Sequence, residues 1–242
     1  MNEPRPKAAH DIVNRGLLIP YAVPYFAYVG IASFIASFGG GWLNEEVGYV
    51  LKILIVPGLM LWAWKWYVPV FGPRDRMDSV WAGIAVGVIG LLVWLLLMAP
   101  FIDIVGEPWE PVPFFLRMFS ATLIVPVFEE YFIRGYFLRA AYQWDMNRKT
   151  MSAKEALLRT LDEDNIKTVP PGAWSVAAVA ISTIAFTVGH LPAEWPAAIA
   201  YSLLMTALWV VRKDLLSCMV AHATTNLMLA LYCYFTGDWG FW

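Results

Sequence analysis

Seven apolar runs dominate the sequence and restrict what it can fold into. A helix that spans a membrane needs about 20 mostly apolar residues, and five of the seven runs contain no Asp, Glu, Lys or Arg. The pattern predicts an all-α polytopic membrane helix bundle with seven transmembrane helices, or eight if the fourth run breaks at Pro126. In chain order, the runs cover residues 17–38, 47–70, 79–102, 113–142, 173–193, 195–211 and 215–237.

Composition supports a membrane protein and excludes several other classes. The chain has 242 residues, of which 60% are hydrophobic and 15% are charged. Soluble domains carry about 45–50% apolar and about 25% charged residues. The net charge of −2 gives no electrostatic reason to expect nucleic acid as a partner. Cys218 and Cys233 lie in one run, about four helical turns apart, so they cannot form a disulfide with each other.

Basic residues indicate how the runs are oriented. Lys and Arg occur in the N-terminal tail, in segments 71–78 and 143–172, and at Arg212 and Lys213, whereas the alternate connections contain none. Positive charge favours the cytoplasmic side of a membrane. We therefore expect an integral protein of the cell (inner) membrane, with a cytoplasmic N-terminus and an external C-terminus. Residues 1–242 are expected to form one membrane domain, with segment 143–172 as a cytosolic connection.

Local signals refine this topology. Ser152 and Glu155 match a capping box, so a short cytosolic helix near residues 153–162 is expected. Basic residues inside the runs are expected to extend to the membrane interfaces; these are Lys52, Lys65, Arg117 and Arg139. Three aromatic residues near the end of the sequence are expected to anchor at an interface, namely Trp239, Phe241 and Trp242.

A few polar side chains lie inside the apolar runs, where their energetic cost indicates a function. An ionisable group in the bilayer costs from about 2.5 to over 10 kcal/mol. Only three His residues exist, and two of them are in apolar runs, whereas His10 is in the polar tail. The costly or polar residues are Glu129, Glu130 and Arg134 in the fourth run, His190 in the fifth, and His222 and Asn226 in the seventh.

Helix geometry sorts these side chains. Glu130 and Arg134 are four residues apart, so they share a helix face and can pair. Glu129 is turned about 100° from Glu130, which leaves it free to face another group. His222 and Asn226 are also four residues apart and present two hydrogen-bonding groups to one place. We therefore expect Glu129 to be the reactive acid and the Glu130–Arg134 pair to be structural.

These groups suit one reaction. Phe186 and His190 share a helix face, so a carboxylate, two imidazoles and a carboxamide come from three helices. A Glu removed from water can act as a general base toward a water molecule. One His can hold that water or pass the proton to a leaving amine, while the other His and the Asn donate to the oxyanion. The pattern predicts peptide-bond hydrolysis by activated water, without an acyl-enzyme and without a metal or organic cofactor.

The three motifs also resemble a known family. Glu129-Glu130-x-x-x-Arg134, Phe186-x-x-x-His190 and His222-x-x-x-Asn226 resemble the CPBP family of intramembrane glutamic endopeptidases, which includes the type-2, Rce1-like CAAX prenyl proteases. The motif region covers about residues 113–235. The run at 123–130 and the closing residues 238–242 are similar to CAAX-protease-related proteins that accompany bacterial exosortase systems.

The resemblance implies a role for each motif residue and a single integral membrane protease domain. In that family, the first Glu and the second-motif His activate water, the third-motif His and Asn form the oxyanion site, and the second Glu and the Arg support them. The corresponding catalytic residues here are Glu129, His190, His222 and Asn226, and the supporting residues are Glu130, Arg134 and Phe186.

Other functions stay open at this point. Two His and a Glu could ligate zinc in an intramembrane metalloprotease, although no H-E-x-x-H motif occurs. The same buried groups could serve a transporter or proton relay. A family pseudo-enzyme that acts in immunity would keep the fold without cleavage. Asn226 could also simply bond a neighbouring helix.

The substrate is expected to be associated with the membrane. A prenylated CAAX tail is the target that gives the resembled family its name. Because most bacteria lack that modification, a membrane-anchored or sorting-signal peptide is the better expectation. The lipid bilayer is the other expected partner.

Overall fold

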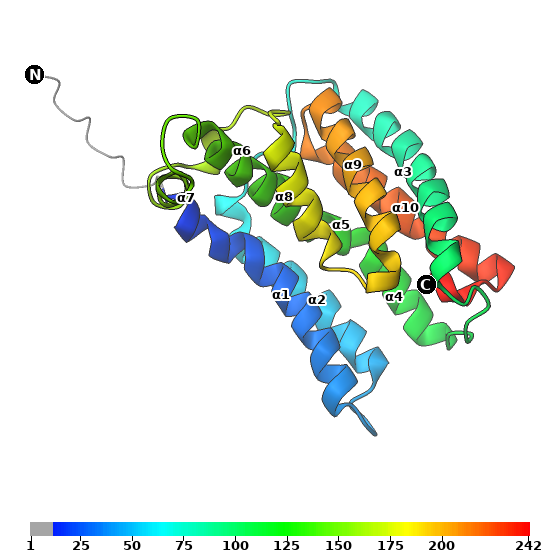
Figure 1. The fold of residues 1–242 in the computed structure, drawn as a ribbon. Helices are drawn as coiled ribbons and strands as arrows, with labels where there is room; N and C mark the ends of the chain where they lie inside the picture. The colour runs from blue at the N-terminus through cyan, green and yellow to red at the C-terminus, as the bar shows by residue number, and fades with distance from the viewer. Residues whose placement is uncertain (1–11) are drawn as a thin grey trace, which may run out of the picture.

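The computed structural model describes residues 12–242, and those residues form a bundle of α-helices without strands (Figure 1). The tail residues Arg5, Lys7 and His10 lie outside the described residues. The helices are α1 (Asn14–Phe38), α2 (Glu45–Ala63), α3 (Arg76–Met98), α4 (Pro111–Leu123), α5 (Val125–Glu130), α6 (Leu138–Asn147), α7 (Ala153–Asp162), α8 (Val176–Thr187), α9 (Trp195–Arg212) and α10 (Leu215–Thr236).

The predicted all-α membrane bundle is confirmed. Within residues 12–242, six helical segments are long and apolar enough to cross a membrane. The run expected at 173–193 gives only the 12-residue helix α8, which is about 18 Å long against a hydrocarbon core of about 30 Å. The chain turns after Thr187 through Gly189 and returns along α9 (Figure 1). This turn ends the helix close to His190.

The fourth run forms one long, irregular helical segment, Pro111–Asn147. Its regular pattern is interrupted at Ile124, where α4 passes into α5. Pro126 has no backbone N–H and therefore cannot continue the ordinary helical bonding. Directly after α5 the chain forms a seven-residue π-helix, η3 (Tyr131–Phe137), a rare geometry that is frequent at functional sites. Both irregularities flank the Glu129–Glu130 pair.

Helices α3 and α10 pack against each other at very short range. A Cβ atom on Gly83 would lie 2.8 Å from the carbonyl oxygen of Ser217, and one on Gly87 would lie 2.6 Å from that of Ala221. Only glycine permits this approach, because any side chain would collide with backbone. The contact fixes α10 immediately before His222.

The polar connection contains the helix that the sequence predicted. Helix α7 covers Ala153–Asp162, and Ser152 and Glu155 form its capping box. The buried side chain of Asn14 ties the start of α1 to this region, because its amide donates to Gln143 Oε1 and to the carbonyl of Thr160, both at 2.8 Å. The N-terminal end of α1 therefore lies against the connection (Figure 1).

Two of the basic residues that are expected to extend to the interfaces are buried. Lys52 is only 6% exposed and lies between the rings of Tyr28 and Tyr49, with Nζ 4.7 Å and 4.3 Å from their centroids. Arg139 is also buried, and its Nη1 donates to the carbonyls of Ile166 and Val169 at 3.3 Å and 2.8 Å. Aromatic faces and loop carbonyls replace water as their partners.

Candidate active site

Three separate parts of the bundle bring the predicted catalytic residues to one cavity. Glu129 comes from α5, His190 from the turn after α8, and both His222 and Asn226 from α10. All four line a cavity of about 160 Å³, as does Phe186. One water molecule needs about 10–15 Å³ of cavity volume measured in this way, so the cavity has room for several water molecules or part of a peptide.

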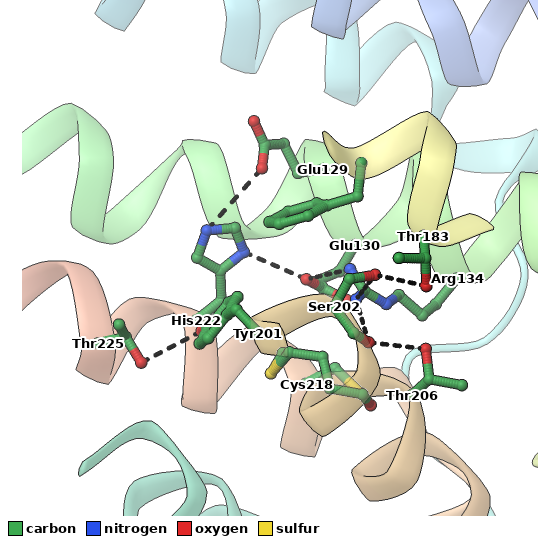
Figure 2. A network of polar contacts seen from close by, with 12 residues as sticks. Glu129, Glu130, Arg134, Thr183, Tyr201, Ser202, Thr206, Cys218, His222 and Thr225 are labelled. Atoms are coloured by element: carbon green, nitrogen blue, oxygen red, sulfur yellow. Dashed lines mark hydrogen bonds and ion pairs between the residues drawn. The ribbon is translucent and has the colours of Figure 1, made fainter. Parts of the chain in front are cut away.

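His222 lies between the two adjacent glutamates (Figure 2). Its Nδ1 is 3.1 Å from Glu130 Oε1, and its Nε2 is 3.8 Å from Glu129 Oε2. The Glu130 side chain is fully buried, whereas that of Glu129 is 16% exposed. The imidazole therefore has one nitrogen in the protein interior and the other toward the acid that lines the cavity.

Behind His222, Glu130 and Arg134 form a completely buried ion pair (Figure 2). Arg134 Nη1 is 3.1 Å from Glu130 Oε1, and neither side chain is exposed. Arg134 Nη2 also donates to the carbonyl and hydroxyl oxygens of Ser202, both at 3.2 Å. The prediction that Glu130 and Arg134 pair is confirmed, and the pair anchors α5 and η3 against α9.

The His190 ring is held from several sides. Its Nδ1 is 3.0 Å from the carbonyl oxygen of Phe186. A carbonyl can only accept, so Nδ1 carries the proton and, in the neutral ring, Nε2 keeps its lone pair. Trp94 packs beside the ring at 5.5 Å between centroids, and the Trp195 indole donates to the His190 carbonyl at 3.1 Å. The free nitrogen can therefore act as a proton acceptor.

Asn226 connects α10 to α4. Its Nδ2 donates to the carbonyl of Ala121 at 2.8 Å, five residues before Pro126. This is the helix-to-helix bond that was the alternative role for Asn226. An amide group carries two N–H donors, so the second can serve a bound molecule. Asn226 is half-buried and lines the cavity.

A polar network that the sequence motifs did not indicate surrounds these residues. Tyr201 donates to the Thr225 hydroxyl at 3.1 Å, and Thr225 donates to the carbonyl of Gly87 at 2.8 Å. The Tyr201 ring packs beside His222, with centroids 5.9 Å apart (Figure 2). Ser202 was also missed. A signal existed, because small polar residues recur at helical spacing within the apolar runs.

The described donors do not form a metal site. Among residues 12–242, no group of three or more His, Cys, Asp or Glu side chains is arranged to hold a metal ion. His222 already has Glu130 on one nitrogen, and the Nδ1 of His190 faces a backbone carbonyl. Each imidazole keeps a second nitrogen, and the sensitivity of cleavage to chelators is the test that decides the zinc alternative.

A comparison with protein families matched the segment that contains the motif residues of this cavity. The family model for type II CAAX prenyl endopeptidase, Rce1-like, matches residues 111–228. The segment belongs to the Rce1-like family. It contains every predicted motif residue, from Glu129 to Asn226. Rce1-like proteins are peptidases, which supports peptidase activity for this membrane protein. Searches of curated proteins and of solved structures gave no match, and the similarity to exosortase-associated proteins stays a prediction.

Proposed function

We propose that this protein is an intramembrane endopeptidase that hydrolyses a peptide bond with water activated by Glu129 and His190. One observation carries the proposal: a carboxylate, two imidazoles and a carboxamide from distant parts of the sequence line the same cavity. A bundle gains no stability by gathering such groups without use, because each is costly in a membrane.

Water activation is assigned to the two groups that can accept a proton. Glu129 faces the cavity, and the unprotonated nitrogen of His190 is left free by the bond from Nδ1 to Phe186. A water between them loses a proton to Glu129 as its oxygen attacks the carbonyl carbon of the substrate. A positioned general base of this kind contributes about 10²–10⁴ to the rate.

Oxyanion stabilisation is assigned to His222 and Asn226. When His222 is protonated on both nitrogens, Nδ1 donates to Glu130 and the Nε2–H is left for the cavity. The second N–H of Asn226 is the other donor. Together they stabilise the negative oxygen of the tetrahedral intermediate, and a donor of this kind contributes about 10²–10³ to kcat.

Collapse of the intermediate completes the reaction. The carbon–nitrogen bond breaks, the carbonyl re-forms, and the proton held by Glu129 goes to the leaving amine, directly or through His190. One product then carries a new carboxylate and the other a new amine. Water supplies the added oxygen and both hydrogens, so the protein returns to its starting state without a covalent intermediate.

Glu130, Arg134 and Phe186 are assigned supporting roles. Glu130 orients His222 from the buried side, and Arg134 balances the charge of Glu130 and connects it to Ser202. Phe186 supplies the carbonyl that fixes the His190 ring. With His222 protonated, Glu129, Glu130, Arg134 and His222 form a cluster without net charge, which lowers the cost of burial.

The location of this cavity sets the substrate class. The cavity lies among helices that are long and apolar enough to cross a membrane, so we propose a membrane-anchored or membrane-associated peptide as substrate. We also propose that the whole of residues 1–242 acts as one protease domain in the inner membrane, with a cytoplasmic N-terminus and an external C-terminus.

The proposal is tested with the purified full chain in lipid vesicles and a panel of membrane-anchored peptides. We expect cleavage that chelators do not reduce, with one ¹⁸O from labelled water in each new carboxylate. Hydroxylamine should give no hydroxamate, because no acyl-enzyme forms. Chelator-sensitive cleavage, or hydroxamate products, would replace this mechanism with a zinc or a nucleophilic one. Proton flux without any cleavage would favour a transporter.

A further inference from the structure

One face of the α4–α5 segment carries a line of four residues that border the cavity. Arg117, Ala121, Val125 and Glu129 follow at four-residue steps, and all four line the cavity. Residues at this spacing lie on one helix face. The two middle side chains are small, so they leave space between the charged groups. The cavity therefore has a guanidinium at one end of this line and a carboxylate at the other.

The guanidinium of Arg117 is held in place by aromatic rings. Its Cζ lies 4.7 Å from the ring centroid of Trp109 and 4.7 Å from that of Trp242. It makes no ion pair within 4.0 Å with any carboxylate of residues 12–242. Aromatic contacts orient an arginine without neutralising its charge, and its planar donors suit a carboxylate well.

The charged residues that line the cavity indicate where a negatively charged group would bind. Of the described lining residues, Arg117 is the only Lys or Arg, and Glu129 and Glu194 are the only Asp or Glu residues. Glu194 accepts a hydrogen bond from the backbone N–H of Leu191, in the turn that carries His190. A negatively charged group on a peptide is therefore attracted to the Arg117 end, where no carboxylate of residues 12–242 pairs with the guanidinium.

We propose that Arg117 binds a carboxylate of the peptide substrate and so sets how the peptide lies in the cavity. This inference rests on the proposed function, because it assigns the substrate of the same site. The carboxylate can come from an acidic side chain or from the end of the peptide. Both present the same planar group to the guanidinium, and pairing with arginine is often bidentate.

The helix spacing defines where that carboxylate lies relative to the cleaved bond. Arg117 and Glu129 are twelve residues apart, which is about 18 Å along the helix. An extended peptide covers this distance in about five residues, and the length of the arginine side chain shortens it. The acid therefore lies about two to five residues from the bond that Glu129 addresses.

Binding tests this inference without depending on cleavage. The full-chain Glu129→Gln protein is incubated in vesicles with N-palmitoylated nonapeptides of random neutral residues. One set ends in a free carboxylate, one ends in an amide, and a third ends in an amide but carries one Asp. We expect at least one acidic set to be retained about 10- to 100-fold better than the neutral amides. The retained set identifies the source of the carboxylate.

Variants then assign the preference to the arginine. Adding Arg117→Gln should remove the preference for acidic peptides. Arg117→Lys should restore this preference in part, because lysine returns the positive charge but lacks the planar guanidinium that pairs bidentately with a carboxylate. Arg76→Gln is the matched control, since Arg76 also lies over an aromatic ring, 4.0 Å from the centroid of Phe71, but does not line the cavity. Equal retention of acids and amides, or a preference that survives Arg117→Gln, overturns the inference.

The cleavage assay separates this inference from the proposed function. If the wild-type protein cleaves peptides but Arg117→Gln keeps the same ratio of acidic to neutral products, the inference fails and the peptidase stands. If no peptide is cleaved but acidic peptides are retained through Arg117, the proposed function fails and a carboxylate-binding site stands.

Discussion

The Nδ1 atom of His222 lies 3.1 Å from the Oε1 atom of Glu130, on the buried side of the imidazole. This contact connects the cavity to the buried ion pair with Arg134. The ring is therefore oriented by a carboxylate that cannot reach the substrate, while the opposite nitrogen faces Glu129. The two glutamates are consecutive in the sequence, yet their environments differ, because successive side chains of a helix point about 100° apart.

Breaking the buried pair should destabilise the fold. Arg134→Met leaves the Glu130 carboxylate buried without its cationic partner, which costs about 3–5 kcal/mol. We expect a clear loss of thermal stability of the purified protein in detergent. Arg15→Gln is the control, because the Arg15–Asp162 pair is exposed and such pairs contribute little. Equal melting of Arg134→Met and wild type would show that the pair is not structural.

The close packing of α3 and α10 should not tolerate a side chain. Gly87→Ala places a methyl group 2.6 Å from the carbonyl of Ala221 and against Thr224. The helices must separate, so both stability and cleavage should fall, because His222 moves with α10. The control is Gly58→Ala, where a Cβ meets nothing within 4 Å and alanine is the better helix former. Gly87→Ala with wild-type melting and rate would refute the packing argument.

Asn226 should affect catalysis more than substrate binding. Asn226→Ala removes the proposed oxyanion donor, so kcat should fall about 10²–10³-fold with little change in KM. Part of any loss of stability will come from the lost bond to Ala121. Thr236→Ala, at the far end of α10, is the control. A normal kcat in Asn226→Ala would leave Asn226 as a helix-packing residue only.

The cap of α7 should make this helix sensitive to pH. Hydrogen bonds from the Ser152 hydroxyl and backbone hold the pKa of Glu155 below its usual range. A carboxyl whose folded-state pKa is lowered stabilises the fold above its unfolded pKa, and that contribution disappears as pH falls through the folded value. Protection of residues 153–162 from hydrogen exchange should thus decrease on acidification in the wild type. Glu155→Gln should show lower protection at neutral pH and a smaller change on acidification; an unchanged pH response would contradict the cap.

Much of the fold could be predicted, because the thickness of the bilayer and the need to satisfy backbone hydrogen bonds require continuous apolar helical runs that are visible in the local sequence. The apolar runs identified the spans, and Ser152 with Glu155 identified α7. The length of α8 could not be predicted, because its run has no Asp, Glu, Lys or Arg to mark an end and the turn at Gly189 depends on tertiary contacts. A Cβ atom on Gly189 would collide with the hydroxyl of Tyr25 in α1. Tyr25 is far from Gly189 in the sequence, so this contact could not be predicted.

The candidate site was predictable in its members and not in its bonds. Charge inside an apolar run pointed to Glu129, and four-residue spacing pointed to the Glu130–Arg134 pair. Spacing within one helix says nothing about the groups on another helix. For that reason the contact of His222 with Glu130, the bond from Asn226 to Ala121 and the role of Ser202 appeared only in three dimensions.

The central claim is that Glu129 takes the proton from the attacking water, and one rate ratio tests it most directly. Glu129→Gln keeps the size and hydrogen-bonding shape of the side chain but removes the base. For a peptide that the wild-type protein cleaves, kcat/KM of Glu129→Gln should be about 10³-fold below wild type, at the same melting temperature. The control is Glu163→Gln, which changes an exposed acid at the end of α7 and should be fully active. A Glu129→Gln protein that cleaves at the wild-type rate would contradict the account.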